Sequence, residues 1–173
     1  MILDKENVIL LIIRDQNTRR DEVAEIDLEE LFLEGAKKLA FKDFDNALEY
    51  FNKILELDAR HVKALEARAV IYLQKGDFEA AERDLNFALE IEPENYRLYF
   101  RLGQIYYRKK DLDRALELFT KAIDLNPMYP AAYMARSQVL RDKGLEEAAD
   151  LELDKAVAAH REMAKAQKII DFA

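Results

Sequence analysis

The chain has 173 residues, a length typical of one domain, and half of them are hydrophobic, which is enough for a buried core. Only 4 glycines and 3 prolines are present while 36% of the residues are charged, a balance that favours helices over a turn-rich sheet protein. The formal net charge of −8 disfavours nucleic acid as a partner, because phosphate binding needs a positive surface. Since cysteine is absent, disulfides, thiol nucleophiles and cysteine metal sites are excluded.

Residues 1–27 differ in composition from everything that follows them. They contain the apolar run VILLII at residues 8–13, which is far too short to span a bilayer. Asp4 and Glu6 precede the run and argue against a secretory signal, so we expect no membrane insertion and a cytoplasmic location. A short strand and a helix both fit the run. We predict a helix, because the downstream chain is helical and a lone strand would have no partner.

From Leu28 onward, small and large residues recur with a period of 34. Three positions keep this register through four copies: Gly35, Ala69, Gly103 and Ser137; Ala47, Ala81, Ala115 and Ala149; and Phe51, Leu85, Phe119 and Leu153. Thirty-four residues accommodate two helices of about fourteen residues and two tight turns. The period predicts a domain over residues 28–173 whose repeats are 28–61, 62–95, 96–129 and 130–163.

Local signals predict how each helix pair is built. The small residue at Gly35 and its equivalents allows the first helix of a repeat to approach the second. Asp43, Asp77 and Asp111 are good N-caps for the second helices. No glycine or proline follows Gly144, so the last helix should run to near Ile170, with residues 164–173 as an extension that caps the domain.

This pattern resembles the tetratricopeptide repeat (TPR) family. Residues 96–129 match nearly all of the family signature, at Tyr99, Leu102, Gly103, Tyr106, Ala115, Phe119, Ala122 and Pro127. The outer repeats depart from it at positions such as Glu34 and Arg136, and terminal repeats of a solenoid must face water on one side. The resemblance implies an all-α fold, a right-handed α-solenoid of four TPR helix-turn-helix repeats with an extra N-terminal segment and a long C-terminal capping helix.

No catalytic constellation occurs in the sequence. The two histidines, His61 and His160, lie about three repeats apart, and exposed structural roles explain them best. Phosphate-binding glycine loops, zinc-protease motifs and nucleophile elbows are all missing from the chain. We therefore expect a protein that is not an enzyme and that binds no cofactor or metal.

The resemblance implies that the first helices of the repeats line a concave groove. Its predicted apolar half consists of Phe32, Leu33, Val70 and Leu73, and its predicted basic and aromatic half of Arg97, Arg101, Gln104, Tyr107 and Arg108. Arg97, Arg101, Gln104 and Arg108 follow one another at helical spacing and share one face. Two explanations of this stripe stay open: neighbouring acidic side chains offset its charge, or it binds an acidic ligand.

One TPR subclass binds the acidic tails of heat-shock chaperones through a clamp of five Lys, Asn and Arg positions. Here Phe32, Ala36 and Ala67 replace three of the five, and only Arg97 and Arg101 keep the charge. Binding of such tails is therefore rejected as the main function. A half-clamp for one carboxylate remains, because arginine can hold a carboxylate with two hydrogen bonds.

These features predict a protein-protein interaction module, an adaptor or scaffold. Its groove would hold a peptide or partner helix with acidic and apolar residues. Two alternatives stay open: a chaperone for one client, similar to the small TPR chaperones of bacterial secretion systems, and a structural unit that self-associates through residues 8–13 or the C-terminal helix. The apolar half of the groove needs a cover, and we expect VILLII to be one candidate.

Overall fold

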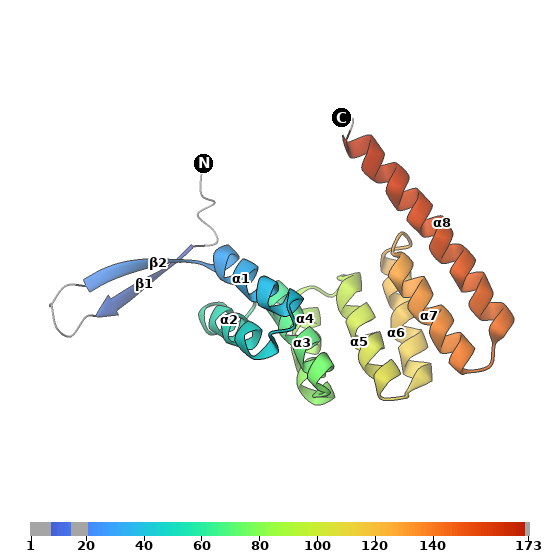
Figure 1. The fold of residues 1–173 in the computed structure, drawn as a ribbon, viewed down its shortest axis with the longest axis horizontal. Coiled ribbons are helices and arrows are strands. Elements are labelled where there is room, and N and C mark those ends of the chain that lie inside the picture. Colours follow the sequence, from blue (N-terminus) through green and yellow to red (C-terminus); the bar gives the residue numbers. More distant parts are fainter. Residues whose placement is uncertain (1–7, 15–20, 172–173) are drawn as a thin grey trace. The chain divides into compact units, whose positions relative to one another are not determined.

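The computed structural model describes residues 8–14 and 21–171, and it describes side-chain surroundings for residues 27–166. The chain forms two compact units, Met1–Ile71 and Tyr72–Ala173. Figure 1 shows the helices and strands in sequence colours.

Helices in pairs make up the chain from residue 28 onward. They are α1 (Leu28–Ala40), α2 (Phe44–Leu57), α3 (Val62–Lys75), α4 (Phe78–Ile91), α5 (Tyr96–Arg108), α6 (Leu112–Leu125), α7 (Pro130–Asp142) and α8 (Glu146–Asp171). The first helix of each pair begins 34 residues after the previous one. α8 has 26 residues, against 13 or 14 in the other helices. The predicted fold class, an α-solenoid of four helix-turn-helix repeats with a long last helix, is confirmed.

The predicted helix in residues 1–27 is wrong for the residues that the structure describes there. β1 (Val8–Arg14) pairs antiparallel with β2 (Asp21–Asp27), and residues 1–7 and 15–20 lie outside the described residues. The charged stretch supplies the partner strand that VILLII was expected to lack: Ile9 stands opposite Ile26, and Ile12 opposite Val23. β-branched residues favour a strand over a helix. Residues 8–13 are therefore not a helix that covers the groove.

The turn inside each repeat contains one residue in the left-handed region. These residues are Lys42, Gly76, Lys110 and Gly144, with φ of 59°, 81°, 65° and 76°. The following residue closes each turn, since its backbone N–H bonds to a carbonyl five residues back, as in Asp77 to Tyr72 at 2.9 Å. Two glycines fit this conformation without strain, whereas the two lysines adopt it at a steric cost.

Two of the three predicted N-caps are confirmed. The carboxylates of Asp77 and Asp111 accept hydrogen bonds from the backbone N–H groups of Ala80 at 3.0 Å and Arg114 at 3.1 Å. Asp43 begins α2 without a cap hydrogen bond. Its carboxylate accepts instead from the side-chain amide of Asn46, at 2.8 and 2.9 Å.

Glycine sets the distance between the two helices of the first and third repeats. A Cβ atom added at Gly103 would lie 2.5 Å from Cε1 of Phe119, and one added at Gly35 would lie 2.9 Å from Cε1 of Phe51. The predicted close approach is confirmed in both. At the equivalent positions the second and fourth repeats have Ala69 with Leu85 and Ser137 with Leu153. Thus a larger residue on the first helix of a repeat accompanies a smaller facing residue on the second helix, as close packing requires.

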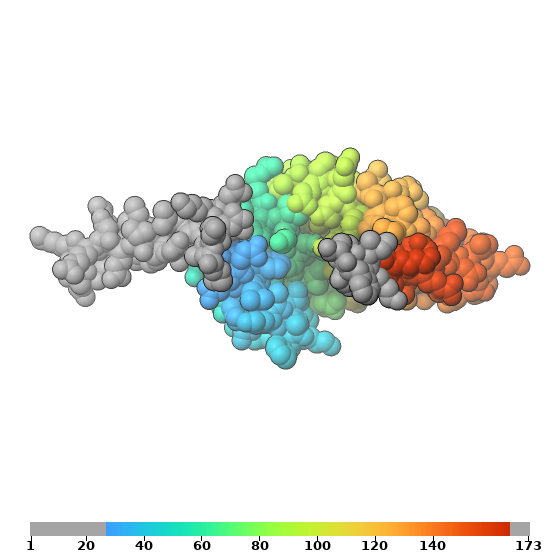
Figure 2. Space-filling view, turned by 90° about the horizontal axis from the view of Figure 1, so that it is seen from above, coloured from blue at the N-terminus to red at the C-terminus, as the bar shows by residue number. Residues whose placement is uncertain are grey.

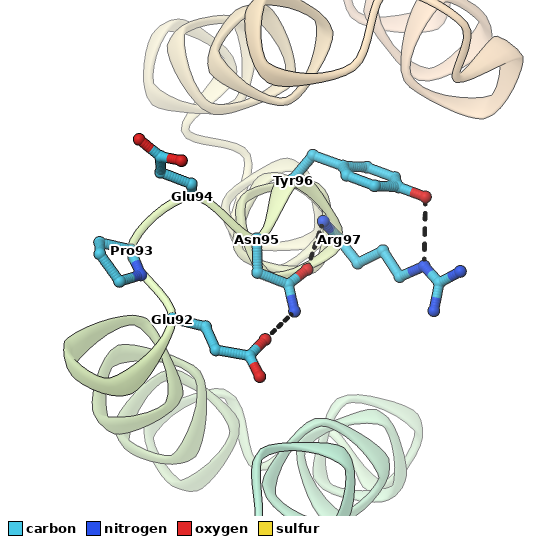
Figure 3. Close-up of a pocket in the computed structure, with 6 residues that line it drawn as sticks. All are labelled: Glu92, Pro93, Glu94, Asn95, Tyr96 and Arg97. Atoms are coloured by element: carbon cyan, nitrogen blue, oxygen red, sulfur yellow. Dashed lines mark hydrogen bonds between the residues drawn. The ribbon is translucent and has the colours of Figure 1, made fainter.

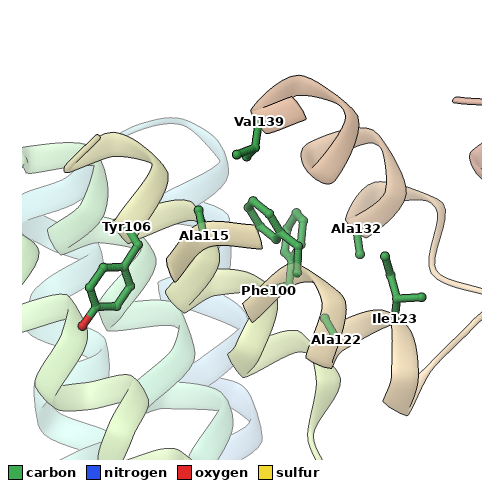
Figure 4. Close-up of a cluster of buried hydrophobic side chains, with 8 residues drawn as sticks. Phe100, Tyr106, Ala115, Ala122, Ile123, Ala132 and Val139 are labelled. Atoms are coloured by element: carbon green, nitrogen blue, oxygen red, sulfur yellow. The ribbon is translucent and has the colours of Figure 1, made fainter. Parts of the chain in front are cut away.

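The core of the second unit joins α5, α6 and α7 (Figure 4). Its buried side chains are Phe100, Tyr106, Ala115, Phe119, Ala122, Ile123, Ala132 and Val139. The ring of Phe100 lies 5.6 Å from that of Phe119 and 5.1 Å from that of Tyr129, so aromatic contacts join α5 to α6 and to the residue that precedes α7. In the first unit, Phe51 and Ile54 are fully buried in the corresponding core.

Arg136, which departs from the repeat signature, has a buried acidic partner. Its guanidinium donates to Glu152 at 2.6 and 2.9 Å and to Thr120 at 3.2 Å. The Glu152 side chain is only 7% exposed and also accepts from Lys155 at 2.8 Å. Thirty-four residues earlier, the same two positions hold Leu102 and Leu118, an apolar version of the pair.

We predict that Gly103→Ala destabilises the protein by about 1–3 kcal/mol, because its methyl group overlaps the Phe119 ring. Adding Phe119→Leu should recover part of this loss, since the second repeat combines alanine with leucine at these positions. Urea unfolding of both single variants and the double variant measures the coupling. Additive effects of the two substitutions would contradict the prediction.

We predict that Glu152→Leu costs about 3 kcal/mol, because it leaves the largely buried Arg136 guanidinium without its carboxylate. The double variant Arg136→Leu/Glu152→Leu should be close to wild type in stability, as the leucine pair of the third repeat indicates. Lys155→Ala is the control, with an expected change within about 0.5 kcal/mol, because this exposed lysine contacts the same carboxylate. A double variant no more stable than Glu152→Leu would be evidence against this account.

Candidate functional site

The predicted basic residues lie along α5, which begins at a well-formed cap. The Asn95 side chain accepts from the Arg97 backbone N–H at 3.1 Å. The buried residues of α5 are Leu98, Phe100, Leu102, Gly103, Ile105 and Tyr106. Because the helical period separates these from the remaining positions, Arg97, Arg101, Gln104 and Arg108 form one stripe outside the core. We call these four residues the α5 stripe.

Arg97, at the start of the stripe, is exposed and held by an aromatic neighbour. Its Nε donates to the Tyr96 hydroxyl at 3.3 Å, and its guanidinium lies 5.7 Å from the centre of that ring. Figure 3 shows both residues beside a surface pocket of about 560 Å³, which residues 92–97 line. The Tyr96 ring packs edge-on against Tyr129 at 4.9 Å, so the residue that orients Arg97 is itself fixed.

Arg101, one turn further along α5, is half-buried. Its Nη1 donates to Oε1 of Gln104 at 3.2 Å, and its guanidinium lies 5.9 Å from the centre of the Phe100 ring. Arg101 and Gln104 therefore act together as one hydrogen-bonded pair of the stripe. An arginine held in this way loses less side-chain freedom when it binds a ligand.

Tyr107 connects α5 to the next first helix, α7. Its hydroxyl donates to Oδ2 of Asp142 at 2.8 Å, and Gln138 donates to Oδ1 of the same carboxylate at 2.8 Å. The hydrogen bond to Asp142, followed by burial, raises the pKa of Tyr107 above the usual 10.0. The bonds from Tyr107 and Gln138 lower the pKa of Asp142 below the usual 3.8. Lys110 lies 5.7 Å from the centre of the Tyr107 ring and adds another positive charge.

Arg108, at the end of α5, is exposed, and it has no ion pair or hydrogen bond within the part of the chain whose side chains are described. The surface formed by α5 and the end of α7 therefore carries the cations Arg97, Arg101, Arg108 and Lys110 together with the carboxylate of Asp142. An acidic group of a ligand could approach Arg108 without displacing a side chain.

The predicted apolar residues have different surroundings from one another. Phe32 is half-buried, with its ring 5.6 Å from Phe51 and 5.9 Å from His61, so it packs in the core of the first unit. Leu73 is 6% exposed and Val70 is half-buried, whereas Leu33 is 55% exposed. Only Leu33 among these four offers most of its side chain to solvent. Phe32, Leu33 and Val70 belong to the first compact unit, and the α5 stripe belongs to the second.

Asp142 and Gln138 also belong to the site, beside the residues predicted to bind the partner. They stand 34 residues after Arg108 and Gln104, at the same positions of the next repeat. The 34-residue period therefore predicts that both residues lie on the same face of α7 as their equivalents do on α5. Among the residues that the structure describes, no cluster of histidine, cysteine and acidic side chains is arranged to hold a metal ion, and no helix is both long and apolar enough to cross a membrane.

Sequence comparison shows the family. One model of the tetratricopeptide repeat matches residues 67–130 and 111–164, and a second tetratricopeptide repeat model matches residues 38–86. The chain therefore belongs to the tetratricopeptide repeat family, whose members are typically protein-protein interaction modules without enzymatic activity.

Individual relatives support the fold. Hsp70-Hsp90 organizing protein 1 from Glycine max is 41% identical over 49 residues, which are 28% of this chain and 9% of that protein, so the chain matches a small part of its length. A crystal structure of MamA superposes with a TM-score of 0.69 at 24% identity, covering 80% of this chain and 81% of that one. TTC0263, a thermophilic TPR protein of Thermus thermophilus, gives 0.70 at 23% identity, covering 78% and 75%.

We predict that Asp142→Asn lowers the pKa of Tyr107 towards 10.0, because the raised value depends first on the hydrogen bond to the carboxylate. The hydrogen bond between Tyr107 and Asp142 stabilises the protein at pH values below the ordinary tyrosine pKa. This stabilisation is lost as the pH rises through the raised pKa of Tyr107. At the acidic end, its contribution is present above the ordinary carboxyl pKa and lost as pH falls through the lowered pKa of Asp142.

NMR titration of the tyrosine ring carbons measures this pKa, and the signal missing from Tyr107→Phe assigns the resonance. Tyr133, for which the structure shows no carboxylate hydrogen bond, is the internal control. An unchanged Tyr107 titration in Asp142→Asn would rule out the Asp142 hydrogen bond as the cause.

Proposed function

We propose that the α5 stripe and Tyr107 bind an acidic segment of a protein partner, and that the chain acts as an adaptor or scaffold. The observation that carries the proposal is the row of arginines on one helix of an acidic chain. Arg97 and Arg101 are oriented by Tyr96 and Gln104, and Arg108 is exposed. With a net charge of −8, the chain as a whole would repel an acidic segment, so attraction must come from a local surface.

The spacing of the arginines fits carboxylates on a peptide. Four residues of helix rise by about 6 Å, which separates Arg97 from Arg101. Two alternate residues of an extended peptide are about 7 Å apart, and their side chains point to the same side. The stripe therefore suits a segment with acidic residues at alternate positions, and each guanidinium can hold a carboxylate with two hydrogen bonds.

Tyr107 gives the surface an apolar contact beside the charges. Its ring packs with the α5–α7 core while its hydroxyl is bound to Asp142. An apolar side chain of the partner can lie on this ring, so the partner segment would combine acidic with apolar residues.

The relative from Glycine max is named for organizing Hsp70 and Hsp90. This chain has Phe32, Ala36 and Ala67 where the five-position clamp has polar residues, and keeps Arg97 and Arg101. The proposal is therefore a different acidic segment, held by two clamp arginines together with Arg108. A chaperone for one client would use the same surface, and would differ in that its client is unstable without it.

We predict that Arg97→Glu/Arg101→Glu loses the partner that wild type retains in affinity capture. Reversal of both charges places like charges at the contact, so we expect at least a roughly tenfold loss of affinity. The matched control is Lys53→Glu/Arg83→Glu, which makes the same charge change at exposed positions on α2 and α4. Quantitative mass spectrometry of captured proteins, followed by calorimetry with the partner segment, measures the effect.

Raising the salt concentration should weaken wild-type binding more than binding by the stripe variant. An identical partner list for the stripe variant and wild type would refute the role of the stripe. Equal losses in the stripe and control variants would show that net charge, and not the stripe, is recognised.

A further inference from the structure

The β1–β2 hairpin lies outside both the helical repeats and the α5 stripe. Its strands, Val8–Arg14 and Asp21–Asp27, form a two-stranded antiparallel sheet (Figure 1). Within residues 8–14 and 21–171 this sheet has no third strand, so each strand has one edge whose backbone N–H and C=O groups lack a partner strand. A two-stranded sheet by itself is only marginally stable, and a free edge is a template on which a further strand can pair.

The two free edges differ in charge. Four of the seven residues of β2 are acidic, namely Asp21, Glu22, Glu25 and Asp27. In contrast, β1 has six consecutive apolar residues and one charged residue, Arg14, at its end. Edge strands of soluble proteins carry charges that prevent association, whereas continuous apolar runs are typical of strands inside a sheet. β2 therefore has the composition of an edge strand, and β1 has that of an inner strand.

The register of the hairpin shows that β1 is apolar on both faces of the sheet. Residues that stand opposite each other share a face, and the two faces alternate along each strand. One face holds Ile9, Leu11 and Ile13 of β1 opposite Ile26, Ala24 and Glu22 of β2. The other face holds Val8, Leu10 and Ile12 of β1 opposite Asp27, Glu25 and Val23 of β2. No alternation of polar and apolar residues therefore marks one face of β1 for solvent.

A second β1 strand fits this free edge in antiparallel orientation. Opposed residues of an antiparallel ladder both direct their backbone groups to the shared edge, and successive residues alternate in this respect. A twofold pair of β1 strands therefore centres on one residue, which stands opposite its own copy. Centring on Leu11, the middle residue, pairs all seven residues of β1. Ile9 then stands opposite Ile13 of the second copy.

The charges favour this pair over the alternatives. Arg14 stands between Asp21 of its own hairpin and Val8 of the second copy, so the β1 pair opposes no like charges. A twofold pair of β2 strands centred on Ala24 would instead oppose Asp21 to Asp27 on both sides of the axis, which is destabilising. Pairing of β1 with β2 of the next copy leaves a free β1 edge on every assembly, so that arrangement does not close.

We propose that two copies of this chain associate through the free edges of β1 and form a four-stranded antiparallel sheet in the order β2–β1–β1–β2. The acidic β2 strands then occupy both edges of the sheet, so the assembly closes at two. β2 ends at Asp27, whose carboxylate caps α1 by accepting from the Glu29 backbone N–H at 2.9 Å, so the hairpin joins the first repeat without a linker. Because the two β2 strands run in opposite directions, the two α1 helices leave the sheet at opposite ends.

Light scattering of the full chain after size exclusion tests this interface, over protein concentrations from about 1 to 100 μM, a range set by affinities typical of small interfaces. Wild type should have the mass of a dimer at the highest concentration. Leu11→Lys should raise the dissociation constant at least about tenfold, because it opposes two like charges at the twofold axis. The matched control is Ala24→Lys, which makes the same charge change opposite Leu11 but on the outer strand. This control should dimerise as wild type does.

Charge pairing at the axis separates loss of the contact from loss of the hairpin. Leu11→Lys and Leu11→Glu should each be monomeric alone at concentrations where wild type is a dimer. A mixture of the two variants should form a dimer, because opposite charges then face each other at the axis. A mixture that stays monomeric would contradict the β1 contact.

Because the chain has no cysteine, single cysteines report the register. Residues directly opposite in an antiparallel pair have Cα atoms about 4.5–5.5 Å apart, which is within the range of a disulfide. Leu11→Cys should therefore cross-link to its own copy under mild oxidation. Ala24→Cys should stay uncross-linked, because the two copies of this position lie three strand spacings apart, about 14 Å. Self cross-linking of Leu10→Cys or Ile12→Cys in place of Leu11→Cys would overturn the pairing about Leu11.

A second apolar surface provides a control for the location of the interface. Met134 and Val157 line a groove of about 520 Å³ between α7 and α8, which are orange and red in Figure 2. Val157 is 49% exposed, so Val157→Asp places a charge in this groove and leaves the sequence of the hairpin unchanged. This variant should dimerise as wild type does.

Three results would overturn the proposal. A wild type that stays monomeric at every concentration would leave the β1 edge to a strand of another protein. A dimer that Val157→Asp dissociates would assign the interface to the α7–α8 groove. Masses that increase without limit would indicate pairing of β1 with β2 of successive copies.

Discussion

The close approach of the two helices within each repeat is the constraint on which the structure depends. At Gly103 there is no room for a Cβ atom against the Phe119 ring, and the first repeat repeats the arrangement at Gly35 and Phe51. Glycine costs some helix stability, but the fully buried rings return more through apolar burial. Where the facing residue on the second helix is a leucine, the first helix has alanine or serine in place of glycine. The summed volume of the two side chains therefore stays similar.

This packing also decides which residues are left for function. On α5, the positions that face α6 and the neighbouring helices are apolar or small, and the helical period leaves the stripe outside the core. The same period places Asp142 and Gln138 beside Tyr107, one repeat later. Structural and functional residues therefore alternate along a single helix. A repeat can change its surface chemistry without changing the packing that defines it.

Some departures from the family signature replace one favourable pair of packed side chains with another. Arg136 and Glu152 occupy the positions of Leu102 and Leu118, and the charged pair stays favourable because Thr120 and Lys155 complete its hydrogen bonds. Likewise, Lys42 and Lys110 take a left-handed turn position that is glycine in the other repeats. Both cases show that the solenoid tolerates local chemistry as long as the helix spacing is kept.

The sequence by itself determined the repeat and the close approach at glycine, because both depend on contacts within one 34-residue unit. It also determined the length of α8, because no glycine or proline follows Gly144. Pattern alone could not give the structure of residues 8–14, since a strand is stabilised by a partner elsewhere in the chain, here β2. It also placed the α5 arginines on one face, yet the burial of Leu73 and the bond from Tyr107 to Asp142 depend on side chains from other elements. Likewise, the period located the last repeat, but only the tertiary structure showed that the groove between α7 and α8 is open, because exposure depends on what packs there.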